Sequence, residues 1–139
     1  MIDIHEVTVS KEEIDQIYDA YANYISREMP DELAVPKEGC EEKILGIAKN
    51  DIQFTDVETG EPIGLSMGTF ECGLHIGSMK FVYLLDGKFV FAEQIKTVDT
   101  MINALNSRSF EDYYDIFMKC FLGMLQNVNR KKEKKNVSI

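Results

Sequence analysis

The sequence predicts an α+β fold, in which an antiparallel sheet of about four strands is packed by two N-terminal and two C-terminal helices. Apolar residues recur at helical spacing at both ends of the chain, whereas between residues 52 and 95 they alternate as in a strand meander. The chain has 139 residues, of which 45% are hydrophobic, which is enough for one core. We therefore expect a single domain over residues 1–129 and a basic, disordered tail over residues 130–139.

Two helices are predicted before the sheet. Ser10 can cap the first helix, Glu13 can complete a capping box, and Pro30 should end the helix. A shorter second helix is predicted over residues 40–50, CEEKILGIAKN, although Gly46 lies inside it. The apolar residues at helical spacing in the first helix are Ile14, Ile17, Tyr18, Tyr21 and Ile25.

The strands are predicted from alternation and from turn residues. Residues 52–57 and 63–67 form one predicted hairpin, and Asp86-Gly87 is a typical two-residue turn between two aromatic and β-branched runs. A tight turn at Gly77-Ser78 should pair Leu74 with Phe81 and His75 with Lys80. The turn at Asp86-Gly87 should then pair Phe81 with Ala92 and Lys80 with Glu93.

The stretch FECGLHIG, residues 70–77, contains a cysteine and a histidine with the spacing of a metal clip. Successive side chains of a strand point to opposite faces, so Cys72 and His75 cannot bind one ion from within a regular strand. Phe70, Cys72 and Leu74 share the apolar face instead. We therefore interpret Cys72 as a core residue and predict no metal site.

The face that carries His75 is also expected to be partly apolar. His75, Lys80 and Glu93 form a predicted polar row on it, which is either a cross-strand charge pair beside a histidine or the floor of a pocket. A sheet with apolar side chains on both faces needs a cover on each, so a helix, a second subunit or a ligand should cover this one. Its predicted apolar members are Val82, Leu84, Phe89 and Phe91.

The C-terminal part is predicted to form two helices, over residues 98–105 and from Ser109 to residue 128. The stripe of the last helix is wide, and together with the second sheet face it offers more apolar surface than one small domain can bury. We therefore expect a homodimer that uses the final helix. The stripe comprises Phe110, Tyr114, Phe117, Phe121, Met124 and Val128, widened by Tyr113, Ile116 and Cys120.

The charge distribution favours a binding function. The chain has 24 acidic and 15 basic residues, a net charge of −9, and its first 61 residues hold 16 acids against 5 bases. Such a surface can simply provide solubility, or it can steer the chain toward a basic protein partner. The leading hypothesis is a non-enzymatic acidic binding protein, such as an inhibitor or immunity-type protein of bacterial or phage origin.

A module that holds a small anionic, nucleotide-like ligand between sheet and helices is the alternative hypothesis. Arg27 and Arg108 are candidate ligand-binding residues because the guanidinium fork suits phosphate and carboxylate. His75, Lys80 and Glu93 are the other candidates. An enzyme that uses His75 is a weaker third hypothesis.

Other classes of function lack a motif. The glycines form no phosphate-binding loop and no serine lies in a nucleophile elbow, so no catalytic residue and no cofactor are predicted. The basic tail has no interleaved aromatics, which disfavours sequence-specific nucleic-acid binding. Three cysteines without close spacing, an acidic start and the absence of a long apolar run indicate a cytoplasmic protein without a membrane span.

Overall fold

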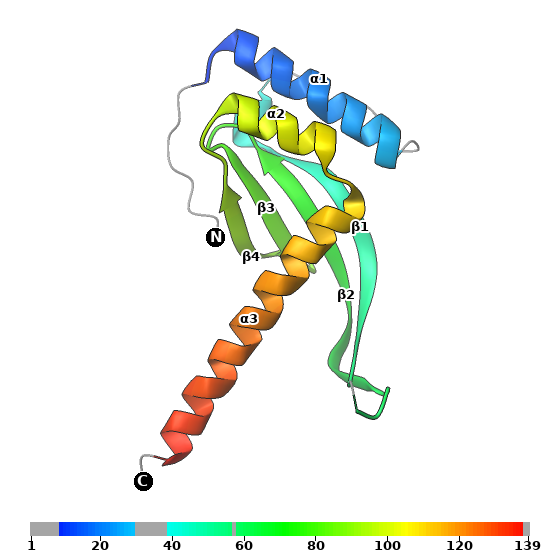
Figure 1. Ribbon diagram of the computed structural model, residues 1–139, viewed down its shortest axis with the longest axis vertical. Helices are drawn as coiled ribbons and strands as arrows, with labels where there is room; N and C mark the ends of the chain where they lie inside the picture. The colour runs from blue at the N-terminus through cyan, green and yellow to red at the C-terminus, as the bar shows by residue number, and fades with distance from the viewer. Residues whose placement is uncertain (1–8, 30–38, 57, 138–139) are drawn as a thin grey trace.

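The computed structural model describes residues 9–29, 39–56 and 58–137, and the side chains of residue 54, residues 62–67 and residues 124–137 are not described. Its sheet is an antiparallel meander in the order β1-β2-β3-β4, which confirms the predicted α+β class (Figure 1). The elements are α1 (Lys11–Glu28), the 3-10 turn η1 (Cys40–Glu42), β1 (Ile44–Thr55), β2 (Pro62–His75), β3 (Lys80–Leu85), β4 (Lys88–Gln94), α2 (Val98–Ser107) and α3 (Phe110–Val137).

The predicted second helix is wrong. The predicted segment forms only a short 3-10 turn over Cys40–Glu42, and β1 begins at Ile44. The β-branched residues Ile44 and Ile47 suit a strand, and Gly46 disfavours a helix. The decisive contribution is non-local: β1 pairs along its length with β2, from Ile44 opposite His75 to Thr55 opposite Pro62.

The first hairpin is longer than the sequence predicts. Residues 63–67 and 70–75 belong to one continuous strand, β2, and β1 starts eight residues before the expected position 52. Because β3 pairs with β2 only at residues 70–75, the distal part of the β1–β2 hairpin has no third strand and projects from the sheet (Figure 1).

The second hairpin confirms its predicted pairs, Leu74 with Phe81 and His75 with Lys80. The third hairpin turns at Asp86 and Gly87, both with positive φ, as predicted. Its predicted pairs are wrong, because a β-bulge beside Tyr83 adds one residue to β4. Phe81 therefore faces Glu93, and Lys80 faces Gln94.

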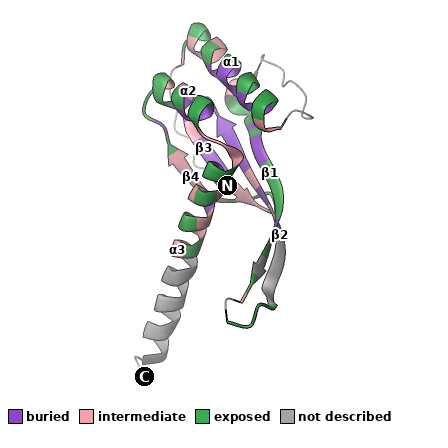
Figure 2. Ribbon diagram, turned by 45° about the vertical axis from the view of Figure 1, so that its right-hand side comes forward, coloured by how far each residue is buried: buried purple, intermediate pink, exposed green. Residues whose placement is uncertain are grey.

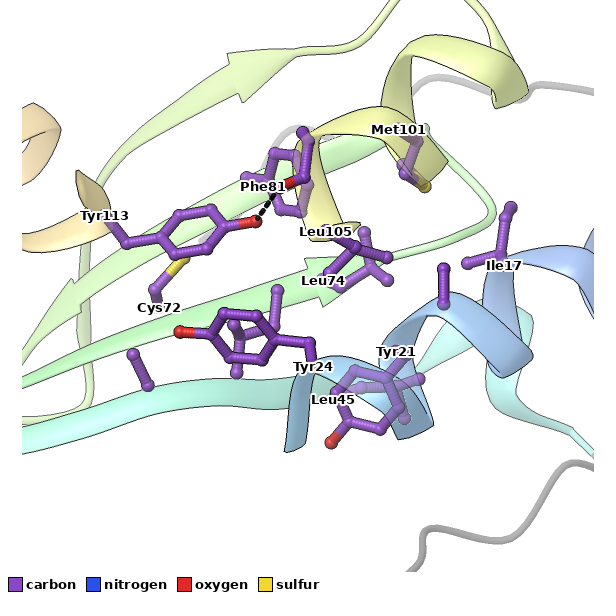
Figure 3. Packing of buried hydrophobic residues seen from close by; sticks show 14 of the residues in the cluster. Ile17, Tyr21, Tyr24, Leu45, Cys72, Leu74, Phe81, Met101, Leu105 and Tyr113 are labelled. Atoms are coloured by element: carbon purple, nitrogen blue, oxygen red, sulfur yellow. Dashed lines mark hydrogen bonds between the residues drawn. The ribbon is translucent and has the colours of Figure 1, made fainter. Parts of the chain in front are cut away.

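Helices α1, α2 and α3 all pack on the same face of the sheet, and the core lies between them (Figure 3). Leu74 and Phe81 of the sheet point toward the helices, as does Cys72. Figure 2 shows the outer side of α1 exposed and its inner side buried. The fully buried large side chains include Ile17 and Tyr24 of α1, Leu105 of α2, and Tyr113 and Phe117 of α3.

The bulge also changes the second face of the sheet. Phe91, expected on that face, lies on the core face and stacks on Tyr83 with a centroid distance of 4.4 Å. Among the described elements no helix covers the second face. Phe89 and Ile44 are 38% and 37% exposed, whereas Val82 between them in the sheet is buried.

Helix α3 starts on the sheet and continues past it (Figure 1). The predicted stripe is confirmed for Phe110, Tyr114, Phe117 and Phe121, which pack against the core. Cys120, predicted to widen the stripe, is exposed instead. The helix runs on through residues 130–137, which the sequence predicts to be disordered. Within the described residues, no helix is both long and apolar enough to cross a membrane.

Candidate functional site

Of the five candidate ligand-binding residues, the structure joins Glu93 and Arg108. Their side chains form a half-buried ion pair at 2.6 Å. The Arg108 guanidinium also lies over the rings of Phe81 and Tyr113, at 5.8 Å and 5.6 Å from the centroids. Burial works against the charged form, but the hydrogen bond and charge of Glu93 raise the pKa of Arg108 overall.

The β-bulge is the reason for this pairing. Without it, Glu93 would lie beside Lys80 on the second face, as the sequence predicts. With it, Glu93 stands opposite Phe81 on the helix-covered face, where Arg108 approaches from the link between α2 and α3. The pair therefore ties the sheet to the helices, and Glu93 does not share a site with His75.

Arg27 closes the end of α2. Its guanidinium donates hydrogen bonds to the backbone carbonyl oxygens of Leu105, Asn106 and Arg108 at 2.7–3.1 Å. These are carbonyls that a helix C-terminus leaves without internal partners. The neighbouring Glu28 carboxylate accepts from the backbone N–H of Phe110 at 3.3 Å, so α1 fastens the α2–α3 link.

His75 and Lys80 face each other across β2 and β3. His75 is fully buried, and its Nδ1 accepts the backbone N–H of Ser78 at 2.9 Å, with the Ser78 hydroxyl 2.8 Å away. Burial lowers the pKa of His75, although Glu42 opposes this shift. The histidine thus holds the Gly77-Ser78 turn in its neutral form, and the predicted pocket floor of His75, Lys80 and Glu93 does not assemble.

The structure places a tyrosine cluster around Cys72 that the sequence does not reveal. Among the described residues the Tyr24 hydroxyl is buried without a hydrogen-bond partner, the Tyr83 hydroxyl is buried beside the Cys72 thiol, and the Tyr113 hydroxyl donates to the Ala104 carbonyl at 3.4 Å. Burial raises the pKa of the Cys72 thiol and of all three tyrosines. These groups therefore stay protonated near neutral pH, so none of them is a ready base or nucleophile. Only the alternation that directs Cys72 inward could have indicated the cluster.

Three carboxylates lie along one stripe of α1. Glu12, Asp15 and Asp19 follow one another at helical spacing, and Glu12 and Asp19 are exposed whereas Asp15 is half-buried. Glu41 of η1 lies near Tyr18 in the middle of α1, because its charge acts on the Tyr18 hydroxyl. We call five carboxylates the acidic face: Glu12, Asp15, Asp19, Glu41 and Glu42. Within the described ranges, the structure shows no ion pair for any of them.

The capping box of α1 forms as predicted, with mutual bonds between Ser10 and Glu13, so Glu13 has a structural role and is not part of the acidic face. Lys11 and Lys43 are exposed, and neither forms an ion pair with another described residue. The acidic face is therefore a group of carboxylates on α1 and η1 that form no ion pair with the other described residues.

Cys72 and His75 lie on opposite faces of β2, as their alternation predicts. Among the described residues, no three His, Cys, Asp or Glu side chains come close enough together to hold a metal ion. No family model, no curated protein and no solved structure matches the chain. The choice between functions therefore depends on the chain's own geometry and charge.

Proposed function

We propose that this chain is a non-enzymatic binding protein whose acidic face engages a basic protein, in the manner of an inhibitor. The observation that carries the proposal is the carboxylate stripe of Glu12, Asp15 and Asp19 on α1, for which the described part of the protein shows no ion pair and of which Glu12 and Asp19 are exposed. Charges that are exposed and unneutralised by the protein's own bases create a field that accelerates encounter with a partner of opposite charge.

The packing of α1 against the rest of the protein supports the same binding role. Its buried face includes Ile17 and Tyr24, which are fully buried, and the Tyr21 hydroxyl donates to the Gly46 carbonyl of β1 at 2.7 Å. Arg27 and Glu28 fix its C-terminal end to the α2–α3 link. A helix held at both its face and its end presents its carboxylates with little freedom, which lowers the entropic cost of binding.

The alternative small-ligand hypothesis has less support. Arg27 is occupied by three carbonyl oxygens and Arg108 by Glu93, so both candidate cationic clamps already have acceptors inside the protein. His75 and Lys80 lie on the other face of the sheet. Both the ligand-binding hypothesis and the enzyme hypothesis built on His75 remain predictions.

Affinity capture with a matched pair of variants tests the proposal. The immobilised chain should retain basic proteins at low salt and release them at high salt. The variant Glu12→Gln/Asp15→Asn/Asp19→Asn should lose them. A control that neutralises Glu58, Glu61 and Asp99, three exposed carboxylates outside the acidic face, should retain them. Equal loss in both variants would contradict a specific acidic face and leave only a net-charge effect.

We also propose that the chain acts as a homodimer. Leu122 of α3 is 48% exposed and is the most exposed large apolar side chain in the described part of the protein. Light scattering coupled to size-exclusion chromatography should give about twice the monomer mass of 15.9 kDa at micromolar concentrations. A monomer mass throughout would contradict the dimer and leave the acidic-face proposal unaffected.

A further inference from the structure

We propose that two copies of the chain pair through α3 in antiparallel orientation, along a stripe that begins at Glu111 and Asp115 and continues through Met118 and Leu122. This inference rests on the homodimer proposed above and adds its surface and direction. It starts from the flank of α3 that does not face its own sheet. Phe117 on the sheet side is fully buried, and Met118 at the border of the flank is half-buried against the core, whereas Asp115 and Leu122 on the flank are exposed.

The spacing along this flank is that of a paired helix. The residues Glu111, Asp115, Met118, Leu122, Leu125, Asn129 and Lys132 follow each other at intervals of four, three, four, three, four and three. Alternating intervals of three and four keep one stripe toward a partner helix over many turns. Since α3 is one continuous helix from Phe110 to Val137, all seven positions fall on the same side of it.

The length of α3 leaves room for such a partner. A helix of 28 residues is about 42 Å long, and its second half extends past the sheet edge (Figure 1). An isolated helical extension gains little stability from propensity alone and usually requires packing along an apolar stripe. The stripe supplies three apolar positions at its centre, and a second copy would cover them.

The charges at the two ends of α3 favour an antiparallel orientation of the paired helices. The stripe begins with two carboxylates, and the exposed Asp112 lies beside them, whereas the sequence from Arg130 to Lys135 carries five bases and one acid. A parallel pair would place acid beside acid and base beside base. An antiparallel pair centred between Leu122 and Leu125 sets Leu122 opposite the other copy's Leu125, and Asp115 opposite its Lys132. It also opposes the two helix dipoles.

The first test removes the apolar centre. Leu122→Asp should raise the dimer dissociation constant by about tenfold or more, because a charge would enter the contact. Cys120→Asp places the same charge on an exposed position on the opposite side of α3 and should leave the constant unchanged. Both variants should keep the wild-type circular dichroism spectrum. A dimer that tolerates Leu122→Asp would overturn this surface without affecting the dimer itself.

The second test determines whether the two α3 helices pair antiparallel, by exchanging acidic and basic residues between the two ends of α3 in the same chain. Glu111→Lys/Asp115→Lys should weaken the dimer, and so should Lys132→Glu/Lys135→Glu, while the chain with all four changes should regain the wild-type constant. Like charges would still face each other in a parallel pair, so the fourfold variant would gain nothing there. If only Lys132→Glu/Lys135→Glu weakens the dimer, the basic end contacts another surface and the antiparallel arrangement is wrong. A wild-type monomer would contradict the pairing and the homodimer together, and binding of a basic protein would be measured independently.

Discussion

Glu93 and Arg108 form an ion pair at 2.6 Å that links the last strand to the connection between α2 and α3. The pair is half-buried, so removing one partner leaves the other charge partly desolvated and unpaired. We expect Glu93→Gln to lower the free energy of unfolding by about 1–3 kcal/mol.

Urea denaturation at neutral pH measures this loss. The double variant Glu93→Gln/Arg108→Met is the control for the pair, because it removes both charges and keeps an apolar side chain above Phe81 and Tyr113. It should lose less stability than the sum of the two single variants. Additive losses would mean that the two residues do not act as a pair.

His75 should make the stability of the protein depend on pH. Its folded-state pKa lies below its usual value of 6.5 because the ring is buried. Between the two pKa values the unfolded chain therefore binds a proton that the folded chain does not bind. The contribution is fully present above the unfolded pKa and is lost as the pH falls from neutrality through 6.5 toward the folded pKa.

Urea midpoints between pH 7.5 and about 5 test this dependence. The wild type should lose stability steadily over that range, and His75→Asn should show a flatter profile because it has no titrating ring. At pH 7.5 the variant should be less stable, since the ring is fully buried and accepts the Ser78 N–H. Parallel profiles for the two proteins would show that His75 does not titrate in this way.

The structure changes the stability that we expect for the variant Cys72→Ser. From the sequence alone, Cys72→Ser should cost about 1–3 kcal/mol, because it buries a hydroxyl in an apolar row without a partner. The structure places the buried Tyr24 and Tyr83 hydroxyls around this position. A serine hydroxyl can bond to one of them, so we expect Cys72→Ser to be at least as stable as Cys72→Ala. Thermal unfolding of the two variants decides it, and a serine variant clearly less stable than the alanine variant would contradict the tyrosine cluster.

Gly73 leaves room for the Ile44 side chain on the neighbouring strand. A Cβ at residue 73 would overlap the Ile44 Cγ2 and stand 3.3 Å from the Leu45 carbonyl oxygen. We expect Gly73→Ala to destabilise the protein by about 1–3 kcal/mol. Ile44→Ala should recover part of that loss in the double variant, because Ile44 is partly exposed and can be shortened cheaply. No recovery in chemical denaturation would place the strain elsewhere.

The sequence predicted the local features of the sheet better than its long-range pairing. Alternation placed Cys72 on the core face and gave the pairing of His75 with Lys80, because those signals are local to one hairpin. The first part of β1, Ile44 to Asn50, was predicted as a helix because its partners in β2 lie about 20 to 31 residues away and the apolar spacing of CEEKILGIAKN also suits a helix.

The predicted row of His75, Lys80 and Glu93 does not form because β4 contains one extra residue. The β-bulge beside Tyr83 leaves no mark in the sequence that turn chemistry or alternation can detect, yet it moves Glu93 and Phe91 to the core face. The roles of Arg27 and Arg108 depend on carbonyl and carboxylate groups about 80 and 15 residues away in sequence, so spacing alone could not assign them.

The acidic face is the central claim, and a titration tests it most directly. A basic protein retained in the capture experiment should be titrated calorimetrically into the wild-type chain, the Glu12→Gln/Asp15→Asn/Asp19→Asn variant and the Glu58→Gln/Glu61→Gln/Asp99→Asn control. The acidic-face variant should bind at least about tenfold more weakly at low salt, with a shallower salt dependence, and the control should match the wild type. Equal affinity of all three proteins for the basic partner would contradict the acidic face as the binding surface.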